Sequence, residues 1–301
     1  MYNSAALDKE LMGALNAMYP NTRALAMIVS GNPGCGKSTL LASVPVPEGK
    51  KRYVIDMEDS MKYLDAGLDA QDVYTPRRQA FSMKRFVFPS IEDVAKIANG
   101  VATGKTSVPV GAVVVDNLAI LQDDIVAYMT ANATNFKALE TVFTQVGAKT
   151  ALPNAGLAKS WVYNHDGMFW SAAKAFARGI IMSCLKSGIH YIASTEQGNV
   201  WVNYGKSDAK ITGQKAKIWD VWYRYSDVVV SLNRDPNKTD PPMGQLYKDQ
   251  PKMRLQGFNP TFKMDWAGFI EELKSAKTRT DAMVPKDLQI AETTEVFSEV
   301  G

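Results

Sequence analysis

A glycine-rich octet occupies residues 31–38 and reads Gly-Asn-Pro-Gly-Cys-Gly-Lys-Ser. Its glycines let successive backbone N–H groups turn toward one centre, where they can surround a phosphate. Lys37 has the reach to contact β- and γ-phosphates, and the Ser38 hydroxyl is a ligand type that Mg²⁺ accepts. The octet therefore predicts a phosphate-binding loop. The residues that we expect to contact nucleotide here are Gly31, Asn32, Pro33, Gly34, Cys35, Gly36, Lys37, Ser38 and Thr39.

The elements around the octet are those that a phosphate-binding loop needs. Residues 24–29 form a short apolar run typical of a buried strand, and residues 38–43 favour a helix that Pro45 stops. The order of strand, glycine loop and helix favours a phosphate-binding loop over the alternative, a glycine turn with an incidental lysine.

Asp116, which directly follows the apolar run 113–115, is the candidate carboxylate for a Mg²⁺ ion. A carboxylate at the carboxyl edge of a buried strand lies where ligands of parallel sheets bind, and it can hold Mg²⁺. The alternative is an aspartate that begins a turn.

The group that activates water must come from elsewhere, because the next residue is Asn117 and not a glutamate. Glu58 follows the strand at 53–55, the next strand after the loop's helix, and we expect it to be the catalytic base. The alternative is a solvated loop glutamate.

The strand 189–195 ends in a polar cluster, Ser194-Thr195-Glu196-Gln197. Polar groups of this cluster, with Thr195, Glu196 and Gln197 as the candidate residues, could sense a γ-phosphate and pass its presence to the next loop. Ordinary strand capping is the competing interpretation.

Buried strands that alternate with helices predict an α/β fold with a mainly parallel, twisted sheet flanked by helices. We expect a C-terminal hairpin at 245–264. The expected organisation is an N-terminal helix in residues 1–23, a nucleotide-binding core in 24–274 and a mobile acidic tail in 275–301.

Composition excludes several protein classes. The 301 residues carry a net charge of +3, which does not by itself indicate nucleic acid binding. Cys35 and Cys184 lack paired spacing, and two histidines are too few for a structural zinc site. Cys35 is expected to be a small loop residue, with a redox role as the alternative. No apolar run has membrane-spanning length and no signal pattern is evident, so we expect a cytoplasmic protein.

The order of these motifs resembles the RecA-type recombinase core over residues 24–264. Residues 53–59 resemble that family's strand with the catalytic glutamate, 113–121 resemble its Walker B strand, and 189–197 take the place of its phosphate-sensing strand. The chain is most similar to compact RecA-like ATPases of bacteriophage recombination modules. The resemblance implies a P-loop NTPase core, ATP and Mg²⁺ as cofactors, self-association into a ring or filament, an annealing partner protein and location in the host cytoplasm.

The resemblance also implies single-stranded DNA as a partner. The segment 198–206, continued by Lys210, Lys215 and Lys217, interleaves lysines with aromatic residues. Such a loop suits a single strand, because cations contact the backbone and rings stack on bases. A solvated basic loop is the alternative. The segment 124–170 is longer than in RecA, and either an enlarged DNA-facing loop or an inserted packing element explains it.

Two basic residues, Lys252 and Arg254, lie where RecA-like subunits send cations into a neighbour's nucleotide site. The resemblance implies that they are catalytic in trans, whereas charges on an edge strand are the alternative. The chain departs from the family where Thr195-Glu196-Gln197 replaces the usual Asn-Gln sensor.

The resulting hypothesis is a Mg²⁺-dependent RecA-like ATPase that binds single-stranded DNA and assists homologous recombination or strand annealing. A nucleotide-gated DNA- or partner-binding module with negligible turnover is the alternative. A small-molecule kinase ranks third because no arginine-rich lid is evident.

Overall fold

The computed structural model describes residues 4–18, 20–62, 64, 83–202, 210–234, 242–246 and 261–283. Among the described residues, eight strands form one sheet in the order β10-β9-β8-β1-β5-β4-β2-β3. The bounds of its strands are β1 Ala26–Gly31, β2 Lys51–Asp56, β3 Met83–Val87, β4 Val110–Asp116, β5 His190–Thr195, β8 Val228–Asn233, β9 Met243–Leu246 and β10 Phe262–Lys263.

The central strands pair in parallel, and β9 and β10 add antiparallel pairs at one edge. Every residue of β1, β4 and β5 is buried, as expected for parallel strands covered on both faces. The α/β fold with a mainly parallel sheet and flanking helices is therefore confirmed. The expected C-terminal hairpin is also present where β9 pairs antiparallel with β10.

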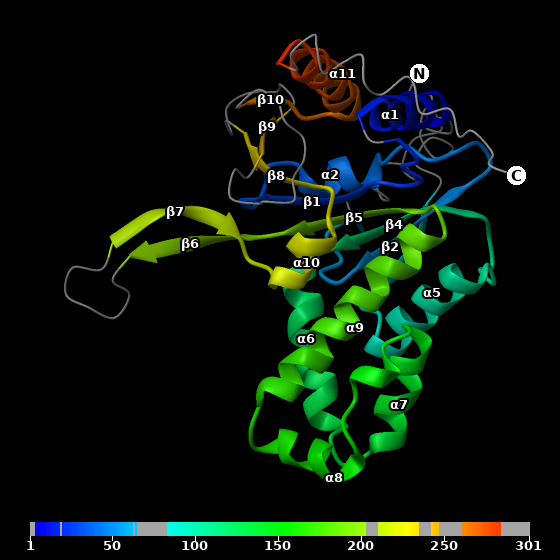
Figure 1. The fold of residues 1–301 in the computed structure, drawn as a ribbon, viewed down its shortest axis with the longest axis vertical. Helices are drawn as coiled ribbons and strands as arrows, with labels where there is room; N and C mark the ends of the chain where they lie inside the picture. The colour runs from blue at the N-terminus through cyan, green and yellow to red at the C-terminus, as the bar shows by residue number, and fades with distance from the viewer. Residues whose placement is uncertain are drawn as a thin grey trace, which may run out of the picture.

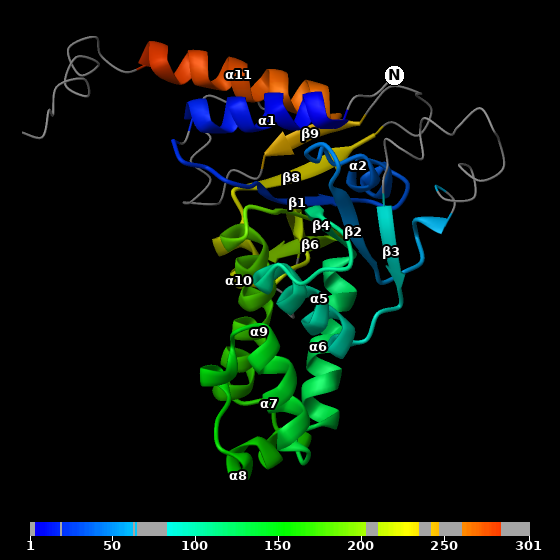
Figure 2. The same cartoon turned by 90° about the vertical axis from the view of Figure 1, so that its right-hand side faces the viewer.

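Two helical layers cover the sheet. The helices are α1 Ser4–Met18, α2 Lys37–Ala42, α5 Ile91–Thr103, α6 Leu118–Ala131, α7 Phe136–Gln145, α8 Ala155–Ala158, α9 Gly167–Lys186, α10 Asp220–Tyr225 and α11 Trp266–Met283. Helices α1, α2 and α11 lie on one face, and α5, α6, α7 and α9 lie on the other (Figures 1 and 2). Alternate strand residues serve the two layers: Ile28 packs with the second layer, and Met27 and Val29 with the first.

The segment after β4 folds into a helical arm that extends away from the sheet (Figure 2). Trp161 and Phe169 are fully buried in it and pack edge to face, with ring centroids 5.4 Å apart. Tyr163 is 93% exposed and Trp170 is 38% exposed. The arm is thus a packed helical unit that also leaves aromatic side chains on its surface.

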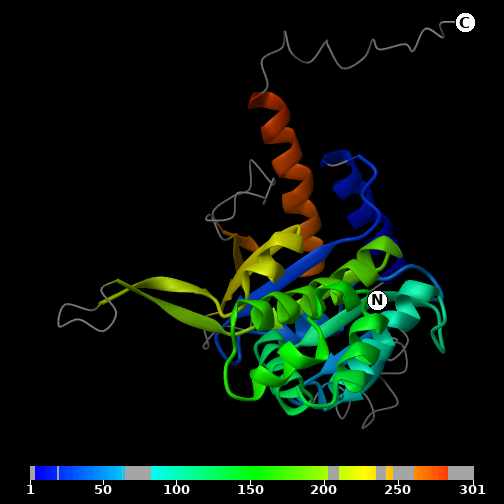
Figure 3. The same cartoon turned by 60° about the horizontal axis from the view of Figure 1, so that its bottom comes forward.

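A second sheet joins β6 Gln197–Val202 to β7 Lys210–Ala216 as an antiparallel pair. This pair projects from the body of the molecule (Figures 1 and 3). The region that we expect to be a DNA-binding loop is therefore largely strand. Residues 203–209 and the side chains of 199–202 and 210–215 lie outside the described part.

Helix α11 packs beside α1 (Figure 2) and continues to Met283, so the domain boundary expected at residue 274 falls inside a helix. Its apolar residues Trp266, Phe269, Ile270 and Leu273 recur at helical spacing and are buried. Within the described ranges, no helix is long and apolar enough to cross a membrane.

Candidate functional site

The glycine loop follows β1 and leads into α2, as the motif predicts. Gly34 and Gly36 have φ values of 78° and 95°, which side-chain-bearing residues rarely adopt. A Cβ atom on Gly31 would lie 2.5 Å from the Cys35 sulfur and 3.0 Å from the Leu232 carbonyl oxygen. The loop therefore requires glycine at these positions, for its dihedral angles or for space.

Lys37 begins α2 and folds back over the loop. Its Nζ donates to the carbonyl oxygens of Gly31 and Asn32 at 2.8 and 3.1 Å. A phosphate oxygen is a stronger acceptor for an ammonium group than a neutral carbonyl oxygen is. Lys37 is thus placed where it can exchange these bonds for a phosphate.

Asp116 ends β4, is only 2% exposed and collects hydroxyl groups from three other elements. Ser38 of α2 donates to its Oδ2 at 2.7 Å, and Ser60, after β2, donates to the same oxygen at 2.5 Å. Ser194 of β5 donates to Oδ1. The predicted pair of Ser38 and Asp116 is therefore in direct contact.

These oxygen donors fit Mg²⁺. Protein sites for Mg²⁺ usually supply one or two oxygen ligands, and water and substrate phosphates complete the octahedron. Ser38 and Asp116 meet beside the loop that would hold those phosphates. In the described part of the chain, no group of three or more His, Cys, Asp or Glu residues could hold a metal. A single carboxylate with a serine matches the Mg²⁺ pattern.

Glu58 lies at the same edge of the sheet. Its Oε1 accepts a hydrogen bond from Asn117 Nδ2 at 3.0 Å. Burial and the neighbouring Asp116 carboxylate raise the pKa of Glu58, and the Asn117 hydrogen bond and the Lys37 charge act in the opposite direction. A raised pKa brings a carboxylate closer to the working range of a general base.

Asn117 serves two elements at once. Its Oδ1 accepts from the Ala119 backbone N–H at 2.7 Å and thereby caps α6, while its Nδ2 holds Glu58. The residue that follows Asp116 therefore caps α6 and holds Glu58.

A buried aspartate shapes the turn that carries Glu58. Asp56 Oδ1 accepts from the Ser60 N–H and Oδ2 accepts from the Met61 N–H, each at 3.0 Å. Arg85 of β3 lies 3.4 Å from Asp59 Oδ1 and 3.9 Å from Asp56 Oδ2. This network fixes the turn against the sheet, because Asp56 is fully buried at the end of β2.

The three residues that we predict to sense phosphate make other contacts. Thr195 Oγ1 donates to the Lys217 carbonyl oxygen at 3.2 Å, and Gln197 Nε2 donates to Ser231 Oγ. The Glu196 carboxylate lies 3.9 Å from Lys217 Nζ. They therefore contact the base of the β6–β7 pair and strand β8, while Ser194 donates to Asp116.

Sequence reasoning missed Ser60, and it named Ser194 only as one member of a polar cluster at the end of β5. The signal for Ser194 is sheet register: Val115 pairs with Ala193, so Asp116 and Ser194 follow as neighbours. For Ser60 the only local signal is an aspartate four residues earlier that can bond its N–H. Lys252 and Arg254 lie outside the described residues.

A buried amide connects helix α6, which follows β4, to the base of the β6–β7 pair. Gln122 of α6 accepts from the Trp219 N–H at 2.6 Å and from Trp222 Nε1 at 3.0 Å. Its Nε2 donates to the Lys217 carbonyl oxygen at 3.4 Å. The carbonyl of Lys217 thus receives bonds from both Gln122 and Thr195.

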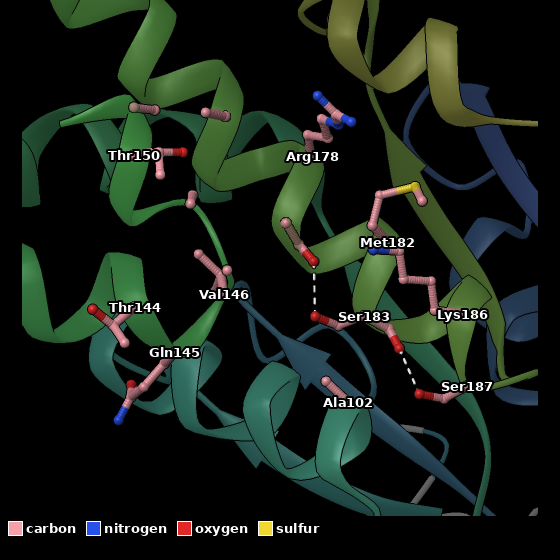
Figure 4. A pocket seen from close by; sticks show the side chains of 15 residues that line it. Ala102, Thr144, Gln145, Val146, Thr150, Arg178, Met182, Ser183, Lys186 and Ser187 are labelled. Atoms are coloured by element: carbon pink, nitrogen blue, oxygen red, sulfur yellow. Dashed lines mark hydrogen bonds between the residues drawn. The ribbon is translucent and has the colours of Figure 1, made fainter.

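A groove of about 630 Å³ lies elsewhere, between α5, α7 and α9 (Figure 4). The hydroxyl groups of Ser183 and Ser187 line it, but both donate to carbonyl oxygens of their own helix. Arg178 stacks over the Tyr225 ring at 5.2 Å. The groove shares no residue with the glycine loop, so we do not place the chemistry there.

No protein-family model matches the chain, and no curated protein matches its sequence. Among solved structures the chain is similar to the crystal structure of the RadB recombinase, at 14% identity and a TM-score of 0.43. That similarity covers 81% of this chain and 89% of the other.

Proposed function

We propose that this chain is a Mg²⁺-dependent, RecA-like ATPase that binds single-stranded DNA and assists homologous recombination or strand annealing. The observation that carries the ATPase part is the position of Glu58. Asn117, the residue after Asp116, donates to the Glu58 carboxylate, and the charges of Asp116 and Lys37 both act on that carboxylate.

Each residue then has a defined task. The loop N–H groups and Lys37 bind the β- and γ-phosphates, and Ser38 and Asp116 hold Mg²⁺. The ion, when bound, neutralises charge on the phosphate oxygens. Glu58 orients the attacking water and accepts its proton, which the raised pKa favours over an ordinary glutamate.

The proposal of DNA binding is supported by where the β6–β7 pair begins. Strand β6 starts at Gln197, three residues after the serine that donates to Asp116, and the pair extends outward from the body (Figure 1). Its sequence combines lysines with Trp201. We propose that this pair contacts single-stranded DNA, and that Lys252 and Arg254 act on a neighbouring subunit's nucleotide.

One observation favours a second candidate, a nucleotide-gated binding module with negligible turnover. Asn117 connects Glu58 directly to the start of α6, and Gln122 connects α6 to the base of the β6–β7 pair. A movement of Glu58 toward bound nucleotide would therefore shift α6 and the β6–β7 pair without any hydrolysis.

The test is ATP hydrolysis measured with and without single-stranded DNA, together with nucleotide binding. Lys37→Ala should abolish nucleotide binding. Glu58→Gln should keep binding but lower the turnover rate at least 100-fold, as expected for a lost general base. Glu140→Gln is the matched control, because Glu140 lies on α7 and forms an ion pair with Lys149, away from the glycine loop.

The outcomes separate the candidates. ATP binding without hydrolysis by the wild-type protein would favour the gated module. Hydrolysis that DNA does not stimulate, together with no DNA binding, would refute the recombination part and leave the ATPase part standing.

A further inference from the structure

A second serine stands at the metal carboxylate, and the phosphate-loop motif does not account for it. Ser60 Oγ lies 2.5 Å from Asp116 Oδ2 and 3.4 Å from Ser38 Oγ. It comes from the turn after β2, so a hydroxyl from the Glu58 turn reaches the same oxygen as the serine of the glycine loop.

Asp56 fixes the position of Ser60. Its backbone N–H and its hydroxyl both lie within hydrogen-bonding distance of Asp56 Oδ1, at 3.0 and 3.4 Å. Asp56 is fully buried, and its other oxygen binds the next N–H along the chain. The hydroxyl is therefore held at the carboxylate by the turn and does not reach it from a flexible loop.

The chemistry of a hydroxyl group distinguishes the two serines. Ser38 can give a lone pair to Mg²⁺ and still donate its single proton to Asp116. Ser60 then supplies the second donor to Oδ2, which restricts rotation of the carboxylate. Hydrogen-bonding partners of a metal-binding carboxylate orient it and strengthen metal binding.

We propose that Ser60 is a positioning residue of the metal site. Its hydroxyl orients Asp116 for Mg²⁺ and joins Mg²⁺ binding to the placement of Glu58, two residues earlier in the same turn. This inference rests on the proposed ATPase function, because it concerns the Mg²⁺–nucleotide complex at that site.

The experiment compares Ser60→Ala and Ser60→Thr with the wild-type chain. Mn²⁺ replaces Mg²⁺ as a paramagnetic probe, and its affinity is measured by electron paramagnetic resonance in the presence of ADP. Affinity for a fluorescent ADP analogue is measured separately without metal. Ser183→Ala is the control, because Ser183 is a buried serine whose hydroxyl donates to the Gly179 carbonyl oxygen of its own helix, outside the site.

Ser60→Ala should weaken Mn²⁺ binding about tenfold and leave metal-free ADP binding unchanged. Ser60→Thr, which keeps the hydroxyl, should restore most of the Mn²⁺ affinity, and Ser183→Ala should resemble the wild-type protein.

Unchanged Mn²⁺ affinity in Ser60→Ala would overturn the inference while leaving the proposed function intact. A loss of metal-free ADP affinity as large as the loss of Mn²⁺ affinity would also overturn it, because it would mean that Ser60 only supports the turn. A wild-type chain that binds no ADP analogue would refute the proposed function itself, and the role of Ser60 with it.

Discussion

Replacement of Gln122 by methionine removes the amide that joins α6 to the base of the β6–β7 pair. The side chains are similar in length, so the change deletes hydrogen bonds with little loss of volume. The acceptor Oε1 serves two donors, the Trp219 N–H at 2.6 Å and Trp222 Nε1 at 3.0 Å. Methionine leaves both donors without that acceptor.

The expected magnitude follows from burial. A buried donor left unpaired costs about 1–3 kcal/mol. The unpaired Nε1–H of Trp222 is fully buried, so its loss costs an amount within that range. Trp219 is partly exposed, so water can replace part of the hydrogen bond that its N–H loses. The apolar methionine regains about 1 kcal/mol by its own burial. The free energy of unfolding should therefore fall by about 1–3 kcal/mol, which lowers the melting temperature by roughly 2–12 °C.

Gln145→Met is the matched control, since its buried Oε1 has no hydrogen-bond partner in the described structure. Its unfolding free energy should stay within about 0.5 kcal/mol of wild type or rise. Both variants are compared by urea denaturation and by differential scanning calorimetry. Equal effects of the two variants, or a Gln122→Met loss under about 1 kcal/mol, would refute the role assigned to the Gln122 network.

Three further predictions concern titratable groups. Burial and the Asp116 carboxylate raise the pKa of Glu58, and the carboxylate is the active form. The rate of ATP hydrolysis should therefore decline with falling pH at a midpoint above about 4.3, the pKa of an ordinary glutamate. A hydrolysis rate that does not change down to that pH would contradict this. Burial raises the pKa of Cys35, so iodoacetamide should label it several-fold more slowly than free cysteine at pH 8, measured by mass spectrometry, and faster labelling would argue against a protonated thiol. Burial also raises the pKa of Asp227, so the folded wild-type protein gains stability by proton uptake as pH falls toward that pKa. Asp227→Asn should therefore be most stabilising relative to wild type at pH 7 and less so at pH 5 in urea denaturation, and a benefit that grows on acidification would exclude this explanation.

The parts of the candidate site that could be predicted are those whose residues lie in a recognisable pattern along the chain. The glycine octet, Asp116 after an apolar run and Glu58 after the preceding strand all depend on residues adjacent along the chain, and the structure places them at one sheet edge. Parallel strands bring their carboxyl ends together, which is why residues far apart in sequence can be predicted to lie at the same sheet edge.

The remaining site features depend on tertiary approach. Ser60 reaches Asp116 only because buried Asp56 folds the intervening turn, and no periodicity signals that contact. Gly179 allows α9 to approach Val146, whose carbonyl oxygen would lie 2.3 Å from an added Cβ, and sequence alone does not pair these two residues. Strands β6 and β7 resemble a polar loop in composition because they are not packed into the main sheet.

The position of β5 between β1 and β4 has a consequence for which mutations the chain tolerates. The glycine loop and Asp116 follow or end strands β1 and β4, which share no backbone hydrogen bonds and lie about 9–10 Å apart, two strand spacings. Ser194 contacts Asp116 only in the observed register, and a one-residue insertion early in β5 would turn that hydroxyl to the opposite face. Such an insertion could preserve an apolar, pairable strand, since β5 is buried on both faces. Apolar substitutions in β5 should therefore be far better tolerated than changes in its length.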